Sequence, residues 1–90
     1  MRVARRLVLT GRVQGVGFRY FVHAAATRAG VAGWVRNLPD GGLEAYLEGE
    51  AEAVTRVERA VRGGPPAARV ETVRADEEPA GGGYSDFSIR

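Results

Sequence analysis

Residues 5–30 read RRLVLTGRVQGVGFRYFVHAAATRAG, and the spacing of the apolar side chains changes partway along this stretch. Over residues 5–13 apolar and polar side chains alternate, which predicts a half-buried strand. From Phe18 to Ala29 the apolar residues recur at every third or fourth position, which predicts a helix that ends at Gly30. Three glycines, Gly11, Gly15 and Gly17, crowd around the change of pattern and indicate a loop with unusual backbone angles. The stretch is therefore a strand, a glycine-rich loop and a helix.

The rest of the chain supplies four strands and a second helix. In the helix Val54, Val57 and Val61 are spaced to face inward, and a Gly-Gly-Pro-Pro run ends it. We expect strands over residues 31–37 and 43–48 joined by the turn Pro39-Asp40-Gly41-Gly42, a helix over 51–62, a strand over 69–74, a mobile loop over 76–85 and a short closing strand over 87–90.

This order of elements, βαββαβ plus a short C-terminal strand, predicts the fold class. Two crossover helices on one face of an antiparallel sheet give an α+β, ferredoxin-like split βαβ sandwich. A chain of 90 residues is enough for one core, so we expect a single domain over residues 1–90. Because this fold carries many unrelated functions, it leaves the chemistry open.

The composition excludes several kinds of site. There is no cysteine and only one histidine, His23, so disulfides, zinc–thiolate sites and multi-histidine metal sites are excluded, and we expect neither metal nor cofactor. Arginines interrupt the first nine residues, which match neither a secretory signal nor a membrane span. We therefore expect a cytoplasmic protein with no membrane contact. The net charge is only +2, and the arginines are scattered among acids, so we expect no nucleic-acid partner.

The glycine-rich loop lies where a helix begins, and such a place suits an anion. A helix N-terminus offers unpaired backbone N–H groups and a positive partial charge, and glycines let these groups approach an anion closely. Arg19, in the first helical turn, adds a planar fork for two phosphate oxygens. No Gly-Lys-Ser/Thr ending is present, and Tyr20 stands where a dinucleotide-binding loop has its third glycine. Taken alone, the loop also fits a plain turn with a solvated arginine.

Two longer strings resemble signatures of the acylphosphatase family. GRVQGVGFR at residues 11–19 is similar to the first signature and GWVRNLPDGGLE at residues 33–44 to the second, while residues 87–90 resemble the family's last strand. Leu43 stands where a valine is common, and the segment 76–85 looks individual. The resemblance covers nearly the whole chain and implies the same split βαβ fold.

The resemblance also implies an activity and its residues. The activity is metal-independent hydrolysis of an acyl phosphate, a small-molecule substrate, to a carboxylate and inorganic phosphate. The family's essential arginine falls on Arg19 and its essential asparagine on Asn37. The resemblance places the phosphate-binding backbone amides at Gly15, Val16, Gly17, Phe18 and Arg19. A monomer suffices for this chemistry.

Three other functions fit parts of the sequence. The RNA-recognition motif shares the fold, but its aromatic signature must lie on a strand, whereas residues 17–22 have helical spacing. An anion-binding module that has lost turnover would not need both Arg19 and Asn37. Carbamoyl-phosphate handling occurs where similar domains begin much larger proteins.

Several other side chains have structural explanations. We expect His23 to be a half-exposed helix residue and Asp40 to serve the turn. Trp34, Arg36 and Tyr46 are expected on the open face of the sheet, partly covered. The alternation in the strand over 43–48 predicts one buried face and one wet face, with Glu44 and Glu48 solvated.

Overall fold

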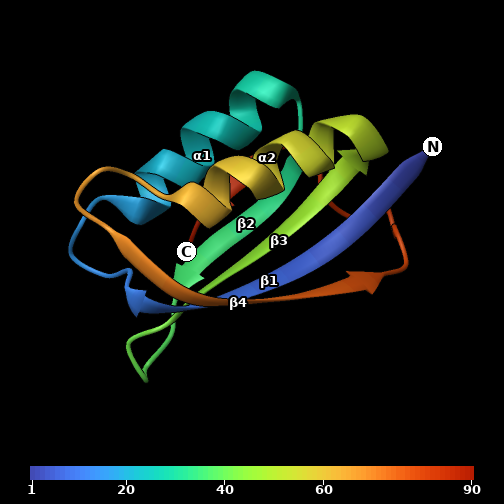
Figure 1. The fold of residues 1–90 in the computed structure, drawn as a ribbon. Helices are drawn as coiled ribbons and strands as arrows, with labels where there is room; N and C mark the ends of the chain where they lie inside the picture. Colours follow the sequence, from blue (N-terminus) through green and yellow to red (C-terminus); the bar gives the residue numbers. More distant parts are fainter.

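A five-stranded sheet carries both helices on one of its faces in the computed structural model, which describes all 90 residues (Figure 1). In chain order the elements are β1 (Arg2–Arg12), α1 (Phe18–Ala29), β2 (Ala32–Asn37), β3 (Leu43–Glu50), α2 (Ala51–Gly63), β4 (Arg69–Glu78) and β5 (Phe87–Ile89). The strand order is β4-β1-β3-β2-β5. The predicted α+β, ferredoxin-like fold is confirmed.

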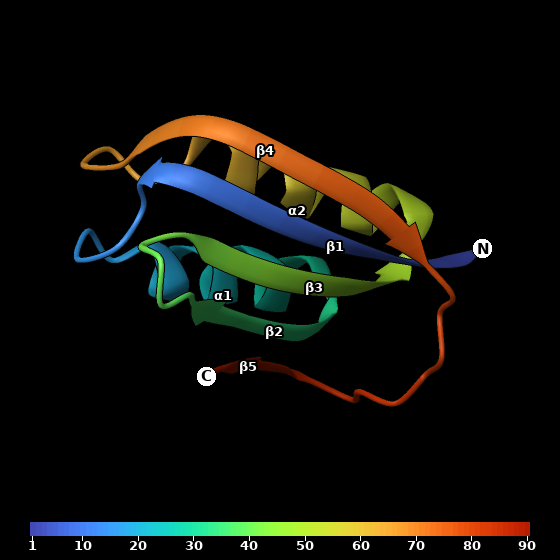
Figure 2. The same cartoon turned by 90° about the horizontal axis from the view of Figure 1, so that it is seen from below.

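The closing strand makes the sheet mixed rather than wholly antiparallel. The first four strands pair antiparallel, but β5 pairs parallel with β2. The chain leaves β4 at one edge, runs round one end of the sheet and joins the opposite edge, as Figure 2 shows. It enters that edge from the end where β2 begins, and this sets the direction of β5.

β4 is longer than predicted, and its last residues overturn part of the expected loop. Residues 76–78, expected in a mobile loop, pair with residues 4–6 of β1. An ion pair reinforces this pairing, with Arg6 Nε 2.6 Å from Glu78 Oε2. Strand β4 lies at an edge and is largely exposed, so acids and arginines replace the alternating apolar residues that mark a half-buried strand.

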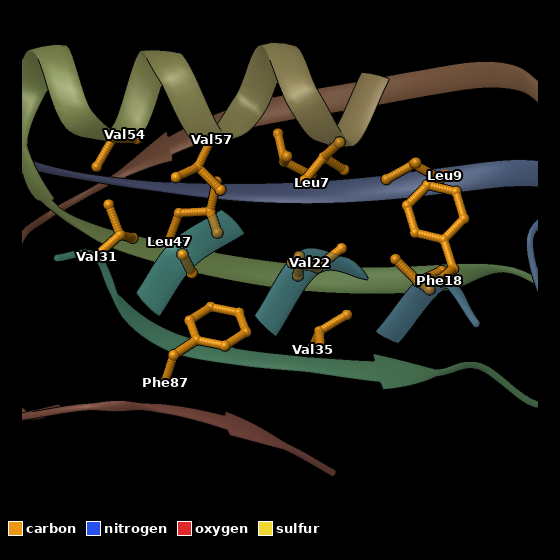
Figure 3. Close-up of a cluster of buried hydrophobic side chains, with 14 of the residues drawn as sticks. Leu7, Leu9, Phe18, Val22, Val31, Val35, Leu47, Val54, Val57 and Phe87 are labelled. Carbon is orange, nitrogen blue, oxygen red and sulfur yellow. The ribbon is translucent and has the colours of Figure 1, made fainter. Parts of the chain in front are cut away.

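The core lies between the sheet and the two helices (Figure 3). The predicted inward residues of α2 are all buried, and α1 buries Phe18, Val22 and Ala26. Its remaining apolar residues at helical spacing, Phe21, Ala25 and Ala29, are partly buried against the same core. Complete burial of one valine, leucine or phenylalanine side chain contributes about 1.5–3 kcal/mol to the stability of the fold. The largest apolar side chains that are fully buried are Leu7, Leu9, Val13, Phe18, Val22, Val35, Leu43, Leu47, Val54, Val57 and Val61. Because Phe18, the first residue of α1, packs in this core, the core fixes where α1 begins.

The face of the sheet opposite the helices is covered, and this corrects the prediction of a wet face. Glu44 and Glu48 are only 7% and 1% exposed. Glu44 accepts hydrogen bonds of 2.6 Å each from Arg6 and Arg36. Glu48 accepts one of 2.6 Å from the backbone N–H of Gly82, in the segment that leads to β5. Buried carboxylates need such partners, and period two along one strand does not show what covers its second face.

The aromatic side chains of this face are covered too, as expected. The rings of Trp34 and Tyr46 stack at 6.1 Å between centroids, and each residue is less than a tenth exposed. Tyr84, from the segment before β5, lies over them. Its ring centroid is 5.4 Å from that of Tyr46, and its hydroxyl oxygen accepts a 3.2 Å hydrogen bond from Trp34 Nε1.

Two connections that bear on the site, and the C-terminal end of the last strand, gather at one end of the sheet. The β1–α1 loop, the β2–β3 turn and the end of β5 lie at that end, and the N-terminus lies at the other (Figures 1 and 2). Strand β1 lies beside β3, and the hairpin places β2 on the other side of β3. The residues singled out in the sequence therefore meet at a single end of the molecule.

Candidate active site

The β1–α1 loop has the backbone that the glycines predicted. Gly15 and Gly17 have φ angles of 73° and 76°, in the left-handed region that side chains disfavour. A Cβ atom at either position would meet no other heavy atom within 4 Å, so the φ angle and not crowding requires glycine here. The backbone N–H groups of residues 15–17 make no backbone hydrogen bond within the protein. They are free to bind an anion.

The N-terminus of α1 adds further donors beside this loop. Gly17 is its N-cap residue, no side chain caps the helix, and its first turn holds no acidic residue. The first N–H groups of a helix have no partner inside it, and they carry a positive partial charge. The whole loop-to-helix junction is therefore electropositive.

Arg19 brings a full charge to the same junction. Its Nη1 donates a 3.1 Å hydrogen bond to the backbone carbonyl oxygen of Arg90, just after β5. Arg5, Arg6 and Arg36 are all ion-paired with glutamates. Arg19 is paired with no aspartate or glutamate side chain, and its bond to the main-chain oxygen of Arg90 orients the guanidinium.

Asn37 ends β2 and faces the loop across a small hollow. The hollow measures about 100 Å³. It is lined by Val13, Gly15, Gly17, Phe18, Arg19, Tyr20 and Asn37. The structure thus brings together both predicted catalytic residues and all but one of the predicted phosphate-binding residues. The exception is Val16, which is partly buried against the core and does not line the hollow.

Gln14 is a site residue to which the sequence assigned no role. Its side-chain nitrogen donates hydrogen bonds of 2.7 Å and 2.8 Å to the backbone carbonyl oxygens of Leu38 and Gly42. These partners belong to the β2–β3 turn, more than twenty residues further along the chain. The only sign of this role in the sequence is that Gln14 is a polar residue beside a glycine-rich loop. That position gives no information about hydrogen-bond partners in the distant β2–β3 turn.

Two other predicted roles are confirmed. Asp40 Oδ1 accepts a 2.9 Å hydrogen bond from the backbone N–H of Gly42, so its carboxylate serves the turn. His23 is half-buried, and its ring packs against Phe87 of β5 with 6.1 Å between centroids. It does not line the hollow.

The carboxylates with clearly perturbed pKa values on the covered face lie outside the hollow. Burial alone would raise the pKa of Glu44, but the hydrogen bonds from Arg6 and Arg36 outweigh it and lower the pKa below 4.5. For Glu48, burial is likewise outweighed by the donors Tyr46 and Gly82, and the pKa is lowered. Neither carboxylate lines the hollow, so neither is placed to act there as an acid or a base.

The structure shows no cluster of metal-binding side chains and no membrane-spanning helix. No three histidine, aspartate or glutamate side chains gather closely enough to hold a metal ion. Neither helix is both long and apolar enough to cross a membrane.

Comparison with known proteins gives one consistent result. The family model described as Acylphosphatase matches residues 5–89. A curated acylphosphatase of Rubrobacter xylanophilus is 55% identical over 85 residues, which cover 94% of this chain and 77% of the relative. That of Anaeromyxobacter dehalogenans is 49% identical over 89 residues, covering 99% and 96%. The crystal structure of acylphosphatase from Bacillus subtilis matches with a TM-score of 0.93 at 40% identity and covers 98% of each chain.

Proposed function

The chain belongs to the acylphosphatase family and acts as a hydrolase on acyl phosphates, and we propose that the reaction takes place in the hollow between the β1–α1 loop and the end of β2. The products are a carboxylate and inorganic phosphate. One observation carries the proposal: Arg19, the glycine loop and Asn37 line the same small hollow.

In this proposal Arg19 and the backbone N–H groups of residues 15–19 hold the phosphoryl group. Phosphoryl transfer passes through a loose transition state whose charge is spread over three equatorial oxygens. Donors that are already fixed around those oxygens stabilise this charge without reorganising during the reaction. No aspartate or glutamate side chain pairs with Arg19 and the first turn of α1 holds no acid, which supports this role.

Asn37 then positions the attacking water. Its amide oxygen accepts a hydrogen bond from water, and its NH₂ group donates one to a phosphate oxygen. A neutral amide approaches a phosphate dianion without the repulsion that a carboxylate would meet. Fixing water in line with the bond that breaks contributes through orientation, and orientation accounts for a large share of such rate enhancements.

The leaving group needs no help from an acid. The phosphorus–oxygen bond to the acyl group breaks as the water oxygen bonds to phosphorus, and the electron pair departs on a carboxylate, which is a weak base. We propose that the water passes its proton to a phosphate oxygen. The residues lining the hollow include no histidine, aspartate or glutamate, which supports this route.

Hydrolysis of benzoyl phosphate in the presence of EDTA tests the proposal. We expect rapid turnover by the wild type. In Arg19→Ala the turnover rate should fall by roughly a hundred-fold or more, and phosphate should no longer inhibit, because the main positive charge of the phosphate-binding site is gone. Asn37→Ala should lose turnover by roughly the same order but keep phosphate inhibition, because only water positioning is removed. Arg28→Ala, in the last turn of the same helix, is the matched control and should behave as wild type.

Two results would contradict these roles. If Asn37→Ala kept a near wild-type rate, water would be positioned by another group. If Arg19→Ala were still inhibited by phosphate at the wild-type concentration, phosphate binding would not depend on this arginine.

Loss of wild-type activity in EDTA would contradict metal independence. The monomeric state and the cytoplasmic location stay predictions.

A further inference from the structure

We propose that Gln14 is a positioning residue, which holds the β2–β3 turn against the phosphate loop and thereby sets where Asn37 lies relative to Arg19. The inference rests on the roles proposed above for Arg19 and Asn37. The Gln14 side chain does not line the hollow. It joins the β1–α1 loop, on one side of the hollow, to the β2–β3 turn, which follows Asn37 on the other side.

The two hydrogen bonds of Gln14 fix the orientation of its amide. Both partners, the carbonyl oxygens of Leu38 and Gly42, can only accept hydrogen bonds. The NH₂ group must therefore face them, and it donates both of its hydrogens, at 2.7 Å and 2.8 Å. The side chain is half-buried, so water competes only partly for these bonds. A two-bond contact also restricts rotation, which a single bond would allow.

The same two carbonyl oxygens already hold the turn together. Leu38 accepts a 3.1 Å hydrogen bond from the N–H of Gly41, and Gly42 accepts a 2.9 Å bond from the N–H of Leu38. Gln14 therefore binds the turn at both of its closing carbonyls. Since Asn37 precedes Leu38 directly, any tilt of the turn moves the backbone that carries the Asn37 side chain.

Little else joins the two walls of the hollow at this point. No backbone–backbone hydrogen bond connects residues 13–17 with residues 38–42. The ladder between β2 and β3 ends at the pair Asn37 and Leu43, so Asn37 occupies the last rung, where strands fray. Arg19, by contrast, is held by α1 and by the carbonyl of Arg90. Gln14 supplies the fixed distance between these two separately anchored residues.

A fixed distance matters because catalysis through orientation is sensitive to small displacements. A misplacement of about 1 Å costs up to roughly a hundred-fold in rate. Phosphate binding is less sensitive, because the loop amides and Arg19 lie on the same wall. The expected signature of losing Gln14 is therefore a lower kcat with unchanged affinity for phosphate.

The test compares Gln14→Met with Asp40→Ala. Methionine keeps the length of the side chain and removes both donors, while Asp40→Ala removes a hydrogen bond within the same turn and leaves the bridge to the loop intact. We expect Gln14→Met to lower kcat for benzoyl phosphate by roughly ten- to a hundred-fold, with the inhibition constant of phosphate unchanged within about two-fold. Asp40→Ala should lower the melting temperature and leave kcat near that of the wild type.

A double-mutant cycle separates positioning from general support of the fold. If Gln14 acts through Asn37, Gln14→Met should change the residual kcat by less than about two-fold in the Asn37→Ala background. Additive losses in the double variant, or an equal kcat loss in Asp40→Ala, would overturn the inference. A wild-type rate in Asn37→Ala alone would instead show that the proposed water-positioning role is wrong, so the two failures are distinguishable.

Discussion

Glu48 shows what a buried charge requires of its neighbours. Its carboxylate accepts hydrogen bonds from the Tyr46 hydroxyl at 2.9 Å, the N–H of Gly82 at 2.6 Å and Arg2 at 3.4 Å. The pKa of Tyr46 shifts in the opposite direction. Its burial and its hydrogen bond to the Glu48 carboxylate raise the pKa of its hydroxyl group from 10.0 to about 12. The neutral hydroxyl is the form that donates, and the folded state selects it.

Tyr46 should therefore ionise only at strongly alkaline pH. Its folded-state pKa lies above the unfolded value, so the stability that it contributes is complete below pH 10.0 and is lost as pH rises towards 12. We expect a late phase near pH 12 when tyrosinate absorbance is followed through an alkaline titration. Tyr46→Phe should remove that phase and lower the free energy of unfolding at neutral pH by about 1–2 kcal/mol, because Glu48 loses a donor.

Tyr20→Phe is the matched control for this titration. The side chain of Tyr20 is 71% exposed, and its replacement should leave the late phase in place. A late phase that persisted in Tyr46→Phe would contradict the assignment.

Among the elements, β2 has one position, Gly33, where β3 leaves no room for a side chain. This residue has a φ angle of 136°, and a Cβ atom built there would lie 1.9 Å from the backbone oxygen of Tyr46. Its N–H donates a 2.9 Å hydrogen bond to the carbonyl of Asp86, just before β5. The path of β2 between β3 and β5 thus depends on a position without a side chain.

Gly33→Ala should destabilise the protein far more than Gly30→Ala. Gly30 ends α1 with a φ angle of 71°, but a Cβ atom there meets nothing within 4 Å. Alanine at Gly30 should cost about 1–2 kcal/mol, the penalty of the left-handed conformation alone. At Gly33 the clash adds to it, and we expect roughly 3 kcal/mol or more. Urea unfolding of both variants measures the difference, and equal losses would show that β2 can shift to accommodate a methyl group.

The elements were predictable where a single local pattern decides them. The stripes of α1 and α2 are set by the core they face, so their spacing already identified the buried side. β4 and β5 were less predictable, because one is an exposed edge strand and the other has three residues. Their pairing depends on β1 and β2, which lie far away in the sequence.

For the molecule as a whole, the sequence predicted the layers but not their outer surface. Arg19 followed from its place beside the glycine-rich loop, but Asn37 was assigned only through the resemblance to a family, since spacing alone does not bring residues from α1 and β2 together. The covering of Glu44 and Glu48 escaped prediction, because their partners come from β1, β2 and the segment before β5. Contacts between distant segments are what alternation within a single strand does not encode.

The buried carboxylates should make the stability of the whole molecule depend on acid. The pKa values of Glu44 and Glu48 are lowered from 4.5 in the folded state, so the unfolded chain binds more protons below that value. Stability should be complete above pH 4.5 and should fall as pH drops through the lower folded-state values. We expect both carboxylates to contribute to this loss.

Urea unfolding at a series of acidic pH values measures this dependence. Glu48→Gln should be less stable than the wild type at neutral pH, but its stability should fall less steeply in acid, because one titrating group is gone. Parallel curves for the two proteins would mean that Glu48 does not contribute to the acid sensitivity.

The covered face also holds the only tryptophan, Trp34. The guanidinium carbons of Arg6, Arg36 and Arg90 lie 5.6 Å, 5.7 Å and 4.5 Å from the centre of its ring, and Tyr84 accepts the hydrogen bond of its N–H. The molecule therefore carries a single tryptophan fluorophore, and it lies on the side of the sheet away from the helices. Tryptophan emission reports whether the segment before β5 is packed over Trp34, whereas far-ultraviolet circular dichroism reports the helices. When the two signals change together, both layers come apart in one event.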